Sequence, residues 1–266
     1  MRLKIISPFF QVSEAVGIRV LKGVQKLGES MIFVGQVFGK LKTFKQRLRL
    51  IFEQMEFVGN QSLMIICICG FFIGAALSLQ VGEIFTIFGA QSVLGAANGK
   101  ALSRELSPLI SGFLMAGRVG ASMTAEIATM RVNEQIDAME AMAVEPLSYI
   151  VIPRIVASIL MLPLLVAIFN IIGQFASFIV AVTVFDIDQG TFFSKMTQIV
   201  DSADVFSGLQ KAFIFGGVIA LVACWYGLRA SGGAKGVGRA TTNSVVTSLL
   251  ILLLIDLVMT YFQTVV

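Results

Sequence analysis

Long apolar stretches separated by short charged segments set the pattern of this chain. Three stretches contain no charged residue: Phe57–Gly82, Ile155–Phe185 and Ala212–Leu228. A fourth, from Ala240 to the carboxyl terminus, is interrupted only by Asp256. A helix needs about 17–25 mostly apolar residues to cross a bilayer, and each stretch reaches or approaches that length. The pattern predicts membrane-spanning helices.

A fifth span is partly hidden, because Arg118 and Glu126 interrupt the apolar run that extends from Leu106 to Met130. We therefore expect an all-α integral membrane protein, with an amino-terminal interfacial amphipathic helix and a short cytoplasmic helix between spans two and three. The five-span domain is expected to cover residues 57–266. Its spans are predicted at about residues 57–82, 106–130, 150–185, 208–228 and 241–264.

Residues 1–56 form a basic region with ten Lys or Arg against four Glu. Within it, apolar residues recur at helical spacing on one face while the cations lie mostly on the other. This pattern is typical of an interfacial helix on anionic lipid headgroups. A soluble basic arm that binds nucleic acid is the alternative, although a span follows at once. The apolar face would consist of Leu41, Phe44, Leu48, Ile51, Phe52 and Met55, and the cations of Lys40, Lys42, Lys45, Arg47 and Arg49.

Basic residues also predict the orientation of the spans, since cytoplasmic loops carry an excess of Lys and Arg. The amino-terminal region and the loops 131–149 and 229–239 are then cytoplasmic. The loop 186–207 and the carboxyl terminus lie outside. In a bacterium with two membranes, this describes a multi-pass protein of the inner membrane with a periplasmic carboxyl terminus.

Composition agrees with a membrane protein and excludes some enzymes. The chain is 56% hydrophobic and 14% charged, with a mean hydropathy of +0.88, whereas soluble domains carry roughly 25% charged residues. Histidine, the commonest general base and a frequent metal ligand, is absent. Gly99-Lys100 is followed by Ala101 and does not complete a phosphate-binding loop. We expect no catalytic residue, no metal and no cofactor bound by this chain.

Three charged residues near the predicted outer ends of spans are candidates for a polar lining. Arg104 and Glu105 are adjacent, so they point about 100° apart on a helix and need different partners. Lys211 opens span four at the same predicted depth as Glu105 and could pair with it or meet an anionic headgroup. The alternatives are charges that merely end a span and a lysine that extends to the interface.

Three further charges fall inside predicted spans, where isolated charge is costly. Arg118 and Glu126 are about 12 Å apart along a helix and cannot pair directly. Asp256, deep in span five, is a possible partner for Arg118. Neighbouring helices could hold Arg118 structurally, and a charge relay is the functional alternative.

The predicted cytoplasmic loop Asn133–Pro146 alternates apolar and acidic residues at helical spacing. Such a short amphipathic helix can insert its apolar residues into a groove on a partner protein, whereas a solvated acidic turn is the alternative. The residues expected to couple to a partner are Glu134, Gln135, Ile136, Asp137, Met139, Glu140 and Met142.

Several of these segments together resemble the MlaE (YrbE-type) permease family, the membrane subunits of ABC systems that move phospholipid between bacterial envelope membranes. The resemblance runs in order over about residues 45–266, with Ser107 where glycine is usual and Glu145 where aspartate is common. Matching segments include Phe72-Ile73-Gly74, Arg104-Glu105-Leu106 with Pro108, Ala116-Gly117-Arg118, Thr124-Ala125-Glu126-Ile127, Met139-Glu140, Leu162-Pro163-Leu164 and Gly238-Arg239-Ala240-Thr241-Thr242.

The resemblance implies a homodimer whose partner ATPase subunits dock on the Asn133–Pro146 loop and supply ATP and Mg²⁺. It also implies an MCE-domain protein on the outer face and, in some systems, a STAS-domain protein on the ATPase. The family's lipid cavity is carried onto Arg104, Glu105 and Lys211 as polar lining. Helical periodicity adds Leu77, Ile84 and Phe88 as apolar lining, while Ile171 in mid span three is expected to capture little lipid.

Two rival functions remain open from the sequence. One is a secondary transporter or channel that uses Arg118, Glu126 and Asp256 as a relay, and the other is a membrane scaffold. Only an ATP-driven system needs a cytoplasmic docking helix. No recognisable motif encodes the direction of transport. The lipid could be a phospholipid, a sterol or another apolar lipid, and no motif distinguishes among them.

Overall fold

The computed structural model describes residues 18, 21, 24–25, 27–41 and 47–265. The chain divides into two compact units, Met1–Thr43 and Phe44–Val266. In the first unit, residues 27–40 are helical, with Phe33 and Val37 buried and Leu27, Met31 and Phe38 exposed. Lys42 and Lys45 of the predicted interfacial helix lie outside the described residues.

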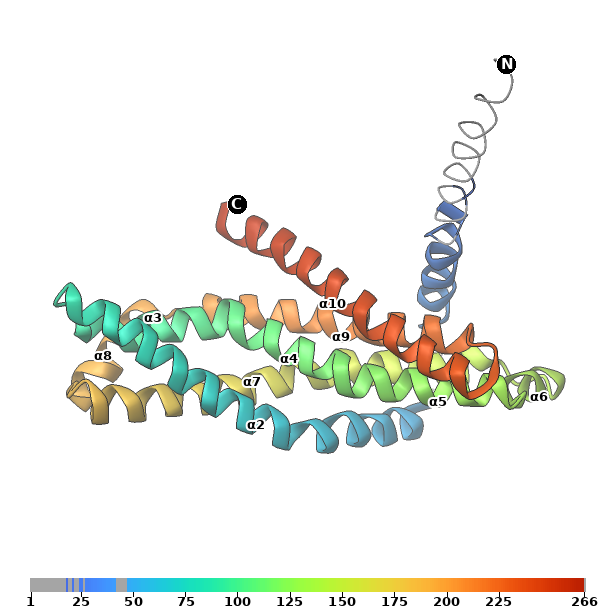
Figure 1. The fold of residues 1–266 in the computed structure, drawn as a ribbon, viewed down its shortest axis with the longest axis horizontal. Coiled ribbons are helices and arrows are strands. Elements are labelled where there is room, and N and C mark those ends of the chain that lie inside the picture. The colour runs from blue at the N-terminus through green and yellow to red at the C-terminus, as the bar shows by residue number, and fades with distance from the viewer. Residues whose placement is uncertain (1–17, 19–20, 22–23, 26, 42–46, 266) are drawn as a thin grey trace, which may run out of the picture. The chain divides into compact units, whose positions relative to one another are not determined.

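All regular structure in the described part of the second unit is helical. Its long helices are α2, α7, α9 and α10, and shorter elements connect or extend them (Figure 1). The elements are α2 (Leu48–Ile87), η2 (Gln91–Val93), α3 (Leu94–Ala101), η3 (Leu102–Leu106), α4 (Ser107–Met115), η4 (Ala116–Gly120), α5 (Ala121–Val132), α6 (Gln135–Ala141), η5 (Leu147–Val151), α7 (Ile152–Val184), α8 (Gln189–Ile199), α9 (Ser202–Leu228) and α10 (Gly233–Val265).

Among the described residues, four helical segments are long and apolar enough to cross a membrane. They are Leu48–Ile87, Leu147–Val184, Ser202–Leu228 and Gly233–Val265. They contain the predicted spans one, four and five in full and all of span three except Phe185. The predicted boundary between residues 56 and 57 falls inside α2, so residues from Leu48 onward continue directly into the first long helix.

The predicted second span corresponds to a helical stretch from Leu94 to Val132 that changes its winding twice. The π turns η3 and η4 separate α3, α4 and α5. Single π turns inside α-helices often occur at functional sites. Here η3 carries Arg104 and Glu105, and η4 carries Arg118. That this stretch crosses a membrane remains a prediction.

A stripe of small residues brings α2 and α7 into close contact. Gly70, Gly74, Ser78 and Gly82 recur every fourth residue and are buried. A methyl group added at Gly70 would lie 3.2 Å from the Phe169 carbonyl oxygen, and one at Gly74 would overlap the Gly173 backbone. The pattern from Gly70 to Gly74 is therefore a true helix contact, as small residues are in many membrane helix pairs.

The predicted outer loop 186–207 contains a helix that the hydrophobic pattern did not reveal. Asp188 begins α8 because its side chain accepts a hydrogen bond from the Thr191 backbone N–H at 2.9 Å. The following helix, α9, begins with a reciprocal cap between Asp201 and Asp204. Phe192 of α8 packs edge to face on Phe178 of α7, with ring centroids 5.4 Å apart. These contacts hold α8 against the end of the bundle.

Candidate functional site

Lys211 of α9 is the centre of a buried polar cluster. Its side chain has 0% exposure, and its Nζ donates hydrogen bonds to Glu105 Oε2 at 2.6 Å and to Thr260 Oγ1 at 2.7 Å. Asp256 Oδ1 lies 3.1 Å from the same nitrogen. The ammonium group thus donates two hydrogen bonds and has a second carboxylate as an ion-pair partner. The cluster thereby joins η3, α9 and α10.

A second group of charges surrounds Asp204, at the beginning of α9. Arg104 lies 3.6 Å from one of its carboxylate oxygens, and Lys100 lies 3.7 Å from the other. Arg104 also donates a hydrogen bond to the Gln263 carbonyl oxygen at 3.2 Å. Asp204 is 6% exposed. Arg104 and Glu105 thus face different partners, as their adjacent positions on a helical turn require.

The two groups together contain three cations and three carboxylates, namely Lys100, Arg104, Lys211, Glu105, Asp204 and Asp256. This balance matters because an unpaired buried charge costs several kcal/mol. The side chains differ in exposure: Lys211 has 0%, Arg104 24% and Glu105 38%. Only Arg104 and Glu105 of the predicted polar lining present their charged groups partly to the surroundings.

The expectation that Lys211 lies at a wet membrane boundary is wrong, because its side chain is enclosed by its own chain. At such a boundary the Lys211–Glu105 pair would contribute only about 0–1 kcal/mol. In the buried cluster, loss of Lys211 would instead leave two carboxylates without their cation. Within a single chain Lys211 therefore supports the partly exposed Glu105 rather than lining an open cavity. A lipid-lining role for these residues stays a prediction.

The predicted apolar lining follows one side of α2 toward its end. Leu77 packs against the cluster formed by Ile66, Leu102, Leu165 and Phe169, together with Leu106 beside Glu105. Ile84 is 52% exposed and Phe88 is 76% exposed. Of the three, only Leu77 lies in the interior next to η3. The other two are available to lipid or to another protein.

Ile171 proves unsuitable as a control for lipid capture. It is 70% exposed and lines a pocket between α7 and α8. The charge-free sequence of span three carried no sign of this pocket, because periodicity does not show where two helices separate.

The three charges inside predicted spans occupy separate environments. Glu126 pairs with Arg154 of α7, with 2.8 Å between the nitrogen and oxygen atoms, and Arg154 is 6% exposed. Asp256 pairs with Lys211, so the expectation that it partners Arg118 is wrong. Arg118 is exposed on η4 and forms no ion pair within the described part of the chain. These residues do not form a continuous relay inside one chain.

The predicted coupling loop forms the short helix α6 between two residues with left-handed backbones, Glu134 and Ala143, each with φ of 57°. Non-glycine residues rarely adopt this conformation, so the ends of α6 are sharply defined. Ile136 is buried in the chain's own fold, whereas Met142 is 68% exposed. Asp137 pairs with Arg131. The apolar surface available to a partner is therefore centred on Met142, with Met139 half-buried beside it.

The four residues Lys100, Asp204, Thr260 and Gln263 belong to the cluster but were missed from the sequence. Asp204 had a detectable signal, since Asp201 and Asp204 have the spacing of a helix amino-terminal cap. Thr260 and Gln263 had none, because polar residues near the end of a span usually mark only the membrane boundary. Their role depends on how α10 is rotated against α9.

Comparison with known proteins gives a consistent result. The family described as Permease MlaE matches residues 51–262. A probable ABC transporter permease protein of Rickettsia conorii is 39% identical over 94% of this chain and 97% of its own length. A probable ABC transporter permease protein of Synechocystis is 38% identical over 85% of this chain and 86% of its own length. One of Porphyra purpurea is 38% identical over 91% and 92%.

Proposed function

The chain belongs to the MlaE permease family, and on that premise we propose that it is the membrane subunit of an ABC transporter that moves phospholipid, or a similar lipid, between the inner and outer membranes. The observation that best supports a lipid role is the pair Arg104 and Glu105. Both are partly exposed and fixed by buried partners, and they adjoin the apolar side of α2. Polar groups beside an apolar wall suit a lipid with a headgroup and acyl chains.

ATP hydrolysis would be supplied by a partner ATPase that binds α6. The helical stretch Leu94–Val132 begins with α3 and with η3, which carries Glu105 of the charged cluster, and α6 follows its other end. Figure 1 shows α3 and α6 toward opposite ends of the bundle. Its length of about 60 Å exceeds the thickness of a bilayer. Movement of α6 by the ATPase could therefore be transmitted to Arg104 and Glu105 along one nearly continuous helix.

The proposed assembly contains a second copy of this chain, two ATPase subunits with their ATP and Mg²⁺, and an MCE-domain protein on the outer face. A STAS-domain protein is an additional candidate on the ATPase. The amino terminus would be cytoplasmic and the carboxyl terminus periplasmic. A charge relay is not favoured, because Glu126 and Asp256 already have other partners.

Purification of the tagged chain from its own membranes tests this proposal. An ABC ATPase should copurify, and Met142→Asp should greatly reduce its recovery by placing a charge on the exposed apolar surface of α6. Ala234→Asp, at an exposed position of the predicted cytoplasmic loop 229–239 and outside α6, adds the same charge elsewhere and is the matched control. Recovery of the chain free of any ATPase, with lipid transport that continues without ATP, would contradict the proposal.

Identification of the cargo needs a separate measurement. Mass spectrometry of lipid retained by the purified complex should find phospholipid, and Glu105→Lys should reduce transport of a fluorescent phospholipid more than it reduces assembly. Retention of a sterol alone would change the proposed substrate.

A further inference from the structure

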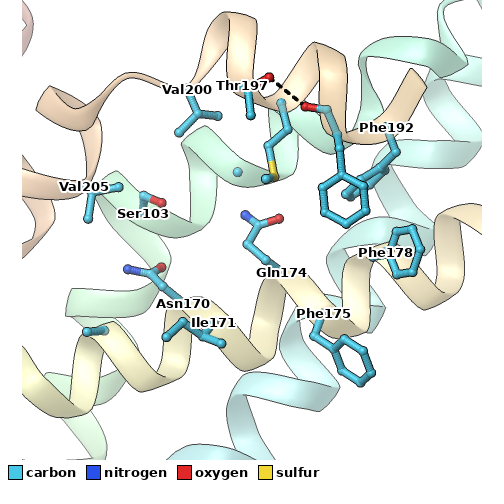
Figure 2. Close-up of a pocket in the computed structure, with 14 residues that line it drawn as sticks. Ser103, Asn170, Ile171, Gln174, Phe175, Phe178, Phe192, Thr197, Val200 and Val205 are labelled. Atoms are coloured by element: carbon cyan, nitrogen blue, oxygen red, sulfur yellow. Dashed lines mark hydrogen bonds between the residues drawn. The ribbon is translucent and has the colours of Figure 1, made fainter. Parts of the chain in front are cut away.

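A pocket of about 570 Å³ lies between α7, α8 and the beginning of α9, and Gly99 of α3 and Ser103 of η3 also contribute to its lining (Figure 2). Its walls are mainly aromatic and aliphatic, and Phe178, Phe193 and Met196 are among them. The volume falls within the range of roughly 300–1,000 Å³ typical of small-ligand sites. None of the described residues that line it is charged.

Two amide side chains, beside the hydroxyl groups of Ser103 and Thr197, supply the polar groups of this pocket. Gln174 extends from α7 toward the space between the helices (Figure 2), and both its Oε1 and Nε2 are buried without a hydrogen-bond partner. Asn170 is 9% exposed; its Oδ1 accepts a hydrogen bond from Ser107 at 2.5 Å, but its Nδ2 has no partner. Nearly all buried polar groups in proteins are paired, and these three atoms are left to pair with a polar group that enters the pocket.

We propose that this pocket binds one acyl chain of a membrane lipid, with the lipid's ester or hydroxyl oxygens hydrogen-bonded to Gln174 and Asn170. The apolar walls suit the hydrocarbon. The amides can donate to an ester carbonyl and, at Gln174 Oε1, accept from a hydroxyl. Because the lining is uncharged, the site would recognise the glycerol and ester region rather than a charged headgroup.

The proposed site goes beyond the transport function and does not depend on which lipid is transported. It is also separate from the Arg104–Glu105 surface, although the two share elements. Ser103 lines the pocket and Arg104 follows it, while Val205 lines the pocket and Asp204 precedes it. A bound acyl chain would therefore contact both η3 and α9, the two elements that carry Arg104 and Asp204, and stabilise their arrangement.

Photocrosslinking in the purified full chain tests the site directly. Benzoylphenylalanine is placed at Phe193, which is 48% exposed and lines the pocket, or at Leu164, which is 55% exposed and does not. After the protein is washed with detergent and irradiated, adducts are identified by mass. We expect several-fold more phospholipid adduct at position 193. Equal yields at both positions, or a detergent adduct alone after lipid is restored, would overturn the proposal.

Two substitutions then probe the walls and the amide, with the photoprobe kept at position 193. Ala167→Phe adds a ring inside the pocket and should reduce the adduct several-fold, whereas Leu164→Phe, on the same helix outside the lining, should not. Gln174→Leu should also reduce it, while the thermal unfolding temperature stays equal or rises because unpaired amide atoms are removed.

An unchanged phospholipid adduct at position 193 in Ala167→Phe would overturn the proposed acyl-chain site. If Gln174→Leu does not fold, the Ala167→Phe result alone tests the site. A normal adduct in Gln174→Leu overturns the assigned role of the amide. The transport proposal fails separately: a chain that captures lipid at position 193 but copurifies with no ATPase would retain this site and lose the transport role.

Discussion

The two π turns η3 and η4 lie on one helical stretch, yet the charged residues of η3 are paired within the chain and that of η4 is not paired with any described residue. On η3, Arg104 and Glu105 are held by Asp204 and by a fully buried Lys211. On η4, Arg118 is exposed and forms no ion pair with any described residue, and a methyl group added at the neighbouring Gly117 would meet nothing within 4 Å. The charges on η3 are paired within the chain, whereas the charge on η4 is exposed and unpaired among the described residues.

This difference separates charges that hold the fold from charges that serve an external contact. Removal of an internally paired charge should lower the stability of the isolated chain. Removal of Arg118 should leave that stability unchanged and affect assembly or transport. Four substitutions test the distinction, in order of decreasing effect on stability.

Lys211→Met should have the largest effect, because it leaves Glu105 and Asp256 next to each other without their cation. We expect a loss of about 3–5 kcal/mol of unfolding free energy, measured by thermal unfolding in detergent. Lys195→Met, at a partly exposed position on α8, is the matched control. A second substitution, Asp256→Asn, should recover part of the loss; a loss below about 1 kcal/mol in Lys211→Met would contradict the assignment.

Glu126→Gln should have the next largest effect. It removes the carboxylate of the ion pair with Arg154, whose remaining hydrogen bond is to the Ile150 carbonyl oxygen at 3.0 Å. Because Glu126 is 52% exposed at its side chain, the expected loss is about 1.5–3 kcal/mol and no more. The same unfolding assay measures it, and Glu140→Gln on α6 serves as the comparison. If Glu126→Gln loses no more unfolding free energy than Glu140→Gln, Glu126 would contribute as little to the stability of the isolated chain as Arg118.

Asp204→Asn should cost about 1 kcal/mol. The asparagine can still accept the hydrogen bond from the Asp201 backbone N–H, but both long ion pairs, at 3.6 and 3.7 Å, are lost. Hydrogen exchange should increase locally at the beginning of α9 rather than throughout the bundle. Exchange that increases equally in α5 would show that Asp204 supports more than its own helix end.

Arg118→Gln should change the unfolding free energy by less than about 0.5 kcal/mol. Transport of a labelled lipid by the reconstituted complex should nevertheless fall several-fold, since the charge is argued to serve a contact outside the chain. Normal transport with reduced stability would show that Arg118 stabilises the fold, as the paired charges on η3 are expected to do, and does not serve an external contact.

The helices themselves were largely predictable, because apolar length and the small-residue pattern are local properties of the sequence. The four-residue spacing of Gly70 and Gly74 is such a local pattern, but it does not identify the partner helix, which the structure shows to be α7. The stretch Leu94–Val132 was recognised only in part, since polar and small residues before Leu106 resemble a loop. Helix α8 was missed because its short amphipathic sequence lies between two spans.

The cluster was less predictable, because its contacts join residues far apart in the chain. Lys211 reaches Glu105, 106 positions away, and Thr260, 49 positions away. Pairing of Lys211 with Glu105 could be suggested from similar depth and opposite charge. Burial of Lys211 and the partner of Asp256 could not, because periodicity gives the faces of a helix but not its rotation against its neighbours.

The small-residue stripe of α2 also restricts where related sequences can carry insertions or deletions. Since Gly70, Gly74, Ser78 and Gly82 must all face α7, one inserted or deleted residue between them would turn everything beyond it by about 100°. Larger side chains would then enter a contact that has no room for a single methyl group. Natural variation in length should therefore be excluded from the middle of α2 and concentrated in connections such as residues 229–232.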